Sequence, residues 1–64
     1  MTMTDEDVAT GAAMMLLRRH GELAPVRVAE RIGELALAGD AGGVELWTRI
    51  ASRMDRILRP GSMQ

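Results

Sequence analysis

Cysteine and lysine are absent from this sequence, and a single tryptophan is its whole aromatic content. Without cysteine the chain forms no disulfide bond, carries no thiolate nucleophile and offers no sulfur ligand to zinc. Such a composition is compatible with the cytoplasm, where we expect the protein to act. The basic residues are all arginine and the formal net charge is -1, so no overall positive field attracts nucleic acid or anionic lipid.

Long apolar runs are missing as well. The longest run, residues 12–17, contains six residues, whereas a membrane-spanning helix needs about 20. A secretion signal begins with basic residues, but here the acidic stretch TDED at residues 4–7 precedes the apolar run. The sequence therefore predicts neither a transmembrane helix nor a signal peptide, and we expect no membrane partner.

What the chain does contain is a series of helix start and stop signals. Thr4 can cap a helix, with Asp7 as its capping-box partner. Gly21, which follows two arginines and a histidine, is typical of a helix end. Pro25 suits the first position of a second helix. The pair Gly39–Asp40 can end that helix and cap a third.

These signals predict an all-α fold, because β-branched residues are scarce and no useful alternation of apolar and polar residues is present. We expect a small three-helix bundle with helices at about residues 5–20, 25–38 and 41–58. The expected organisation is a single helical domain over residues 1–59, followed by a disordered C-terminal tail at residues 60–64.

The predicted helices differ in the width of their apolar faces. Residues 25–38 are plainly amphipathic, and their core face is Val28, Ala29, Ile32, Leu35 and Ala36. The third helix has an apolar arc of roughly 160°, wider than the ~100° that one core contact needs. The first helix is broader still, because Met14 lies almost behind its main apolar stripe. That stripe consists of Val8, Ala12, Met15 and Leu16.

This surplus of apolar surface predicts a homodimer, or a complex with an unidentified protein partner, formed through the first helix and part of the third. A chain of 64 residues is also close to the lower size limit at which one core stabilises a fold. Tryptophan is common in cores and enriched at interfaces. The predicted interface residues are Met14, Leu17, Leu46, Trp47 and Ile50.

Arginines recur at positions i, i+4 and i+7 along one side of the third predicted helix. They are Arg49, Arg53 and Arg56. Such a stripe can follow a nucleic-acid backbone, so a small nucleic-acid-associated regulator is the alternative function. However, Glu45 can pair with Arg49, and Asp55 with Arg59, which weakens the positive field. We interpret the stripe as a solvated helix face, ahead of a site for an acidic protein partner, and rank nucleic-acid binding last.

Combinations of residues typical of catalysis are not found. His20 is the only histidine, and we interpret it as a cation at a helix C-terminus. The glycine-rich segment at residues 39–43 lacks the lysine and hydroxyl residue of a phosphate-binding loop, and it is explained as a turn between helices. We therefore expect a non-enzymatic protein with no catalytic residue, no cofactor and no metal site.

The segment from His20 to Leu58 combines an HG pair, an Ala-rich helix, a GD pair and a helix that bears a tryptophan. In these features it resembles a group of short bacterial proteins of unknown function, and the resemblance implies no activity. The matching positions are His20, Gly21, Gly39, Asp40, Gly43 and Trp47.

A second, local similarity is to the helical hairpin of a single tetratricopeptide repeat. It implies that the second and third helices pack antiparallel. The residues that carry this similarity are Leu35, Gly39, Asp40, Val44 and Ala51.

Overall fold

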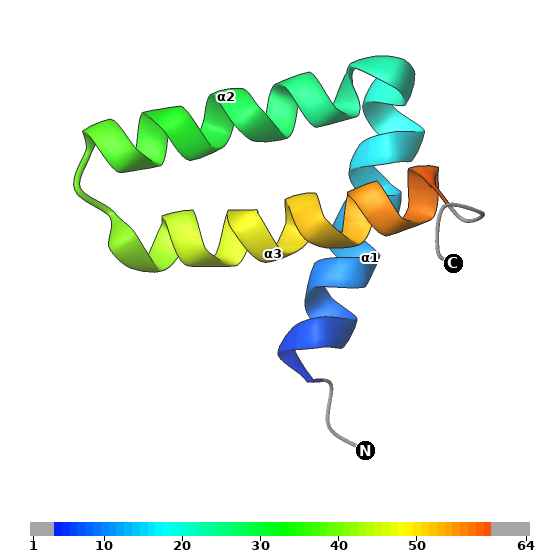
Figure 1. The fold of residues 1–64 in the computed structure, drawn as a ribbon, viewed down its shortest axis with the longest axis horizontal. Coiled ribbons are helices and arrows are strands. Elements are labelled where there is room, and N and C mark those ends of the chain that lie inside the picture. Colours follow the sequence, from blue (N-terminus) through cyan, green and yellow to red (C-terminus); the bar gives the residue numbers. More distant parts are fainter. Residues whose placement is uncertain (1–3, 60–64) are drawn as a thin grey trace.

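The computed structural model describes residues 4–59, and the described part is helical with short turns and no strand (Figure 1). Helix α1 spans Asp5–His20, a 3-10 turn η1 spans Gly21–Leu23, α2 spans Ala24–Leu37 and α3 spans Ala41–Leu58. The all-α prediction is confirmed. The tail predicted at residues 60–64, and the first three residues of the predicted domain, lie outside the described residues.

The first two helices are not separated by a non-helical linker. The backbone stays helical from Asp5 to Leu37 and only bends through η1. Counted as uninterrupted runs, the described chain has two helical segments, 5–37 and 41–58, and the prediction of three separate helices was wrong in this respect. The bounds predicted for the first and third helices agree with α1 and α3. Helix α2 begins and ends one residue earlier than the predicted range of 25–38.

The bend between α1 and α2 is encoded locally. Gly21 has φ 60° and ψ -130°, a backbone conformation that residues with a Cβ atom rarely adopt, and it ends α1. Pro25 then lies in the first turn of α2, where its missing N–H would have had no partner within the helix. The start of α1 is also set by neighbouring residues, because the Thr4 hydroxyl accepts a hydrogen bond from the Asp7 N–H at 3.1 Å. The Asp7 carboxylate accepts one from the Thr4 N–H at 3.2 Å, which completes the predicted capping box.

The second reversal of the chain lies between α2 and α3. The Asp40 carboxylate accepts a hydrogen bond from the Gly43 N–H at 2.9 Å, so Asp40 caps α3 as predicted. A Cβ atom on Gly43 would lie 2.7 Å from Asp40 Oδ2 and 3.1 Å from Leu35 Cδ2. Glycine at this position therefore allows both the cap and the close approach of α2. The result is an antiparallel α2–α3 hairpin, as the likeness to a tetratricopeptide hairpin implied (Figure 1).

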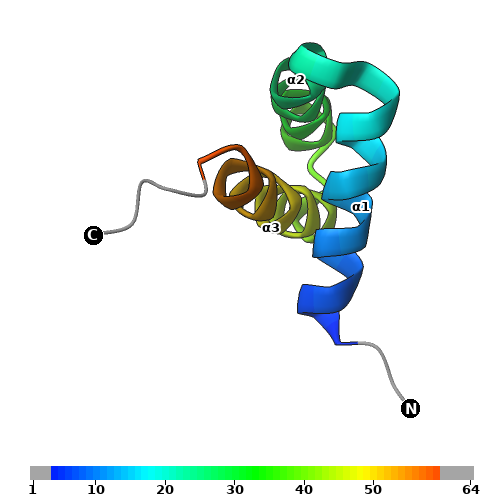
Figure 2. The same cartoon turned by 90° about the vertical axis from the view of Figure 1, so that its right-hand side faces the viewer.

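Helix α1 crosses the hairpin steeply and covers one of its faces (Figures 1 and 2). Its contacts are mainly with α3, with fewer to α2. In Figure 2 the hairpin is seen nearly end-on with α1 on its right, and the left-hand face of the hairpin has no described helix packed on it. The hairpin thus has one covered face and one open face.

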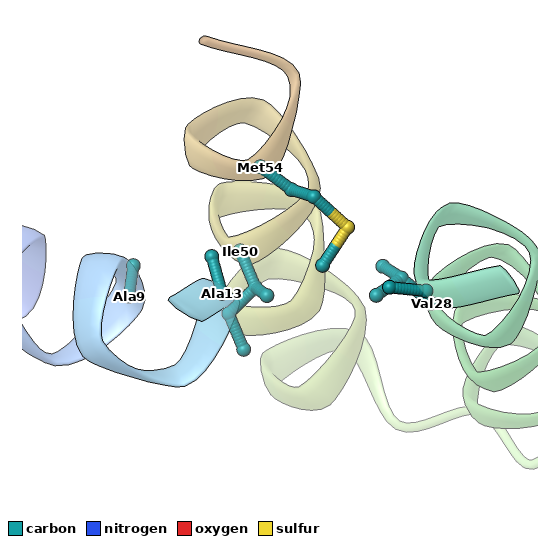
Figure 3. Close-up of a cluster of buried hydrophobic side chains, with 6 residues drawn as sticks. Ala9, Ala13, Val28, Ile50 and Met54 are labelled. Carbon is teal, nitrogen blue, oxygen red and sulfur yellow. The ribbon is translucent and has the colours of Figure 1, made fainter. Parts of the chain in front are cut away.

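The core is small and rich in alanine. Figure 3 shows Ala13 of α1 next to Ile50 of α3, with Ala9 one turn away on α1, and the Met54 side chain directed toward Val28 of α2. The fully buried residues of the described chain are Ala9, Ala13, Ala24, Val28, Ile50 and Met54. Small side chains at the crossing let the backbones of α1 and α3 approach closely, since larger ones would hold the two helices apart.

The predicted main stripe of α1 was right for Ala12 and Leu16 and wrong for Val8 and Met15. Met15 is 65% exposed and Val8 is 45% exposed, whereas Ala9 and Ala13 are buried. Ala12 and Leu16 are half-buried against the core. The steep crossing selects the alanines for the contact with α3, and this selection turns the methionines toward solvent.

Candidate functional site

The five predicted interface residues do not form one exposed surface. Met14 and Leu46 are exposed, whereas Leu17 and Trp47 are half-buried against the core. Ile50 is 4% exposed. Its assignment to an interface was wrong, because α1 already covers its side chain within the single chain (Figure 3).

Trp47 is held within the hairpin. The Arg31 guanidinium carbon lies 6.0 Å from the centre of the indole ring, within the range of a cation–π contact. Arg31 also forms an ion pair with Glu34 at 3.0 Å, so its guanidinium group is anchored on α2. In this position Trp47 joins α2 to α3 through packing, and much of its ring is covered within the single chain.

Two arginines of the stripe on α3 form ion pairs with the acidic N-terminal turn of α1. Arg49 lies 3.5 Å from Asp5, and Arg53 forms an ion pair with Glu6. Both carboxylates belong to the first turn of α1, where negative charge also favours the helix dipole. Two of the three predicted charged-surface residues, Arg49 and Arg53, are therefore partly neutralised. Within residues 4–59, no ion pair involves the third, Arg56.

The expected ion pair of Glu45 with Arg49 was wrong, because Arg49 pairs with Asp5 across the helix crossing. The expected pair of Asp55 with Arg59 is present at 3.2 Å. Sequence spacing predicts an ion pair between residues of the same helix. It does not predict a pair between α3 and α1, because that pair depends on how α1 crosses α3.

The described residues show neither a metal site nor a membrane span. Within residues 4–59, His, Asp and Glu side chains do not gather in a group of three or more that could hold a metal ion. In the same range, no helix combines the length and the apolar character needed to cross a bilayer. His20, the lone histidine, is half-buried at the C-terminal end of α1.

Helix α2 separates its charged from its apolar residues. Arg27 pairs with Glu30 at 3.0 Å, and Arg31 pairs with Glu34 at the same distance. These four residues are all the charged side chains of α2, and they leave the rest of its surface uncharged. Ala29 and Ala36, which the sequence placed on a core face with Val28, are exposed. They belong to a surface that the sequence-based prediction did not identify as open.

A groove runs between α2 and α3, and every residue that lines it comes from these two helices. Its cavity has a volume of about 180 Å³, and Val28 and Met54 are among its lining residues. Nearer the 38–40 turn, Ala36 and Val44 line a second hollow. We call the apolar residues along these two hollows the open face: Pro25, Ala29, Ile32, Ala36, Val44, Ala51 and Leu58.

A signal for the open face was present in the sequence. Positions 25, 29, 32 and 36 follow the three- and four-residue steps that keep residues on one side of a helix. Positions 44, 51 and 58 recur every seven residues on α3. This periodicity predicts an apolar side, but it cannot tell whether another helix of the same chain covers that side.

Comparisons with known proteins give membership of a family but no activity. No curated protein and no solved structure matches the chain. The expected likeness to proteins of unknown function is supported at that level, whereas the HG, GD and Trp positions are not tested individually. The Family of unknown function (DUF6961) matches residues 7–61, which is most of the chain, and the chain therefore belongs to this family.

Proposed function

We propose that this protein is a non-enzymatic interaction module that associates with a second copy of itself. The observation that carries the proposal is the contrast between its core and its surface. Half of the fully buried residues of the described chain are alanines, whereas nine large apolar residues are 38% to 93% exposed. They are Val8, Met14, Met15, Leu23, Val26, Leu37, Leu46, Ile57 and Leu58.

Association would bury part of this exposed apolar surface, and removing it from water is favourable. Burial of one Val, Leu, Ile or Met side chain contributes about 1.5–3 kcal/mol relative to full exposure. A domain near the lower size limit gains much from even a few such contacts. Because only the folded chain offers the surface, association also stabilises the fold.

The charges of the chain favour an apolar protein partner over nucleic acid. The net charge is -1, and Arg49 and Arg53 are engaged by Asp5 and Glu6. A polyanion would have to displace these carboxylates before it could follow the arginine stripe. These charges support self-association ahead of the alternative of a nucleic-acid-associated regulator. The cytoplasmic location expected from the sequence belongs to the same proposal.

Light scattering across a concentration series tests the proposal. At the highest concentrations of the series we expect about twice the chain mass of 7.0 kDa, together with a melting temperature that rises with protein concentration. A monomer whose melting temperature is independent of concentration would overturn the proposal. Fluorescence anisotropy with a labelled DNA duplex, run on the same samples, would promote the regulator if it detected micromolar binding.

A further inference from the structure

We infer that the surface used for self-association is the open face of the α2–α3 hairpin, and that its occupant is the open face of a second copy. Two hairpins then form a four-helix arrangement, with each α1 on the outside. This inference rests on the proposed function and names the partner surface, which contains Leu58 among the nine exposed large apolar residues. It differs from the sequence-based prediction, which placed the interface on the first helix and part of the third.

The groove between α2 and α3 gives the open face the shape that a helix from another chain fits. Its cavity of about 180 Å³ is lined by Ala29 and Ile32 on one side and by Ala51 and Leu58 on the other. Helices pack by placing the side chains of one helix into the grooves of another, at interaxial distances of about 8–10 Å. Paired hairpins satisfy this requirement in four-helix bundles.

The charged side chains around the groove are already paired, which favours an uncharged partner surface. The four charged side chains of α2 pair with one another away from the groove-lining residues. Asp55 lies at the groove and forms an ion pair with Arg59 at 3.2 Å. Asp40, at the second hollow, accepts a hydrogen bond from the N–H of Gly43. A copy of this face therefore meets it without strong repulsion between like charges, and a polyanion finds no cluster of arginines on it.

The size of the open face matches a weak dimer. Helix α2 has 14 residues, which corresponds to a length of about 21 Å. Two helices side by side are about 20 Å wide, so the flat footprint is about 400 Å² per copy. Side-chain relief raises the accessible area above this value, and two copies together bury about 1,000 Å². This is the lower bound for a specific interface, so we expect the dimer to dissociate on dilution.

The outer side of α1 is a poorer candidate. It exposes Met14 and Met15, but no residue of α1 lines either hollow of the open face. Arg18 and Arg19 are exposed beside Met15 near the C-terminal end of the helix. An interface through Met15 would have to cover these charges or displace them, and the desolvation of unpaired charge opposes association.

Matched arginine substitutions on the two surfaces test the inference. Ala29 is exposed in the single chain, so Ala29→Arg leaves the folded monomer intact while placing an unpaired charge in the proposed interface. We expect its dissociation constant to rise at least tenfold over that of the wild type. Met15, which is 65% exposed on α1, provides the control. Met15→Arg should leave the dissociation constant within about threefold of the wild type. Circular dichroism at low concentration verifies folding, and Ala36→Arg replaces Ala29→Arg if that variant fails to fold.

The outcomes separate the two levels of the argument. A monomeric wild-type chain at every concentration overturns the proposed function. A wild-type dimer that persists in folded Ala29→Arg or Ala36→Arg overturns the open face as its location and leaves self-association standing. A dimer lost in Met15→Arg but kept in Ala29→Arg moves the interface to α1. A dimer lost only through the α2 variants supports the inference.

Discussion

The two faces of the α2–α3 hairpin are both apolar at their centres and differ at their edges. On the covered face, Arg49 and Arg53 border the contact with α1 and meet Asp5 and Glu6. Along the open face, the charged side chains of α2 are paired with one another, and Asp55 is paired with Arg59. The covered face thus carries positive charge that matches a partner of opposite sign, α1. The open face is close to neutral, which is what a surface that binds its own copy requires.

The largest effect is expected for a charge placed under α1. Ala13 is 0% exposed at the crossing of α1 and α3. Ala13→Arg would bury an unpaired cation and force the helices apart, at a cost of about 3 kcal/mol or more. We expect the cooperative thermal transition followed by circular dichroism to be lost. The same substitution at Ala29, measured at a concentration where the chain is monomeric, should change stability by less than about 0.5 kcal/mol. A near-normal melting temperature for Ala13→Arg would mean that α1 does not pack on the hairpin.

An intermediate effect is expected at Leu17. The sequence placed this residue at an interface, but its side chain is half-buried against the core of the single chain. Leu17→Glu should therefore destabilise the monomer by about 1–2 kcal/mol, because it places a carboxylate against apolar neighbours. Leu37→Glu is the control, since Leu37 is 93% exposed, and its effect should stay within about 0.5 kcal/mol. Urea denaturation of dilute samples measures both. Equal effects of the two substitutions would contradict the burial of Leu17.

The smallest effect on stability is expected for the ion pairs at the edge of the covered face. Asp5 is 83% exposed in its pair with Arg49, and Glu6 is 64% exposed in its pair with Arg53. Removing both carboxylates with Asp5→Asn and Glu6→Gln should cost at most about 1 kcal/mol per pair, and less at high salt.

The control for these charge changes is the double variant Glu22→Gln with Glu45→Gln. It alters the net charge by the same amount, on exposed residues that form no ion pair within residues 4–59. The wild-type chain should bind a DNA duplex no more tightly than about 10⁻⁴ M at about 150 mM salt. Tight binding by the wild type, abolished by Arg53→Glu, would show that the carboxylates of α1 do not shield the stripe.

Features set by neighbouring residues were predictable from the sequence. Thr4, Gly21 and Asp40 fix helix ends through contacts within a few residues, and the predicted bounds agree with the structure to within one residue. The bend at η1 was harder to predict, because a glycine and a proline mark it in the same way as they mark a linker.

Features set by the crossing of α1 and α3 were not predictable. Helix α1 carries apolar side chains on more than one side. Its hydropathy pattern therefore did not show whether the side with Ala9 or the side with Met15 is buried. The pairs of Arg49 and Arg53 with α1 join residues far apart in the sequence. Ala29 was placed on a core face because periodicity identifies an apolar side without identifying what covers it.

The corner formed by Gly21 and Pro25 also affects whether two molecules of this chain can exchange helix α1. Because α1 contacts mainly α3, another molecule could supply the same contacts if the corner opened into one long helix. Pro25 opposes that opening, since its ring would clash with the Gly21 carbonyl in a straight helix and it has no N–H to donate. Gly21, in its positive-φ conformation, favours the bent form as well. Together they favour the packing of α1 on its own hairpin and so oppose the exchange of α1 between molecules.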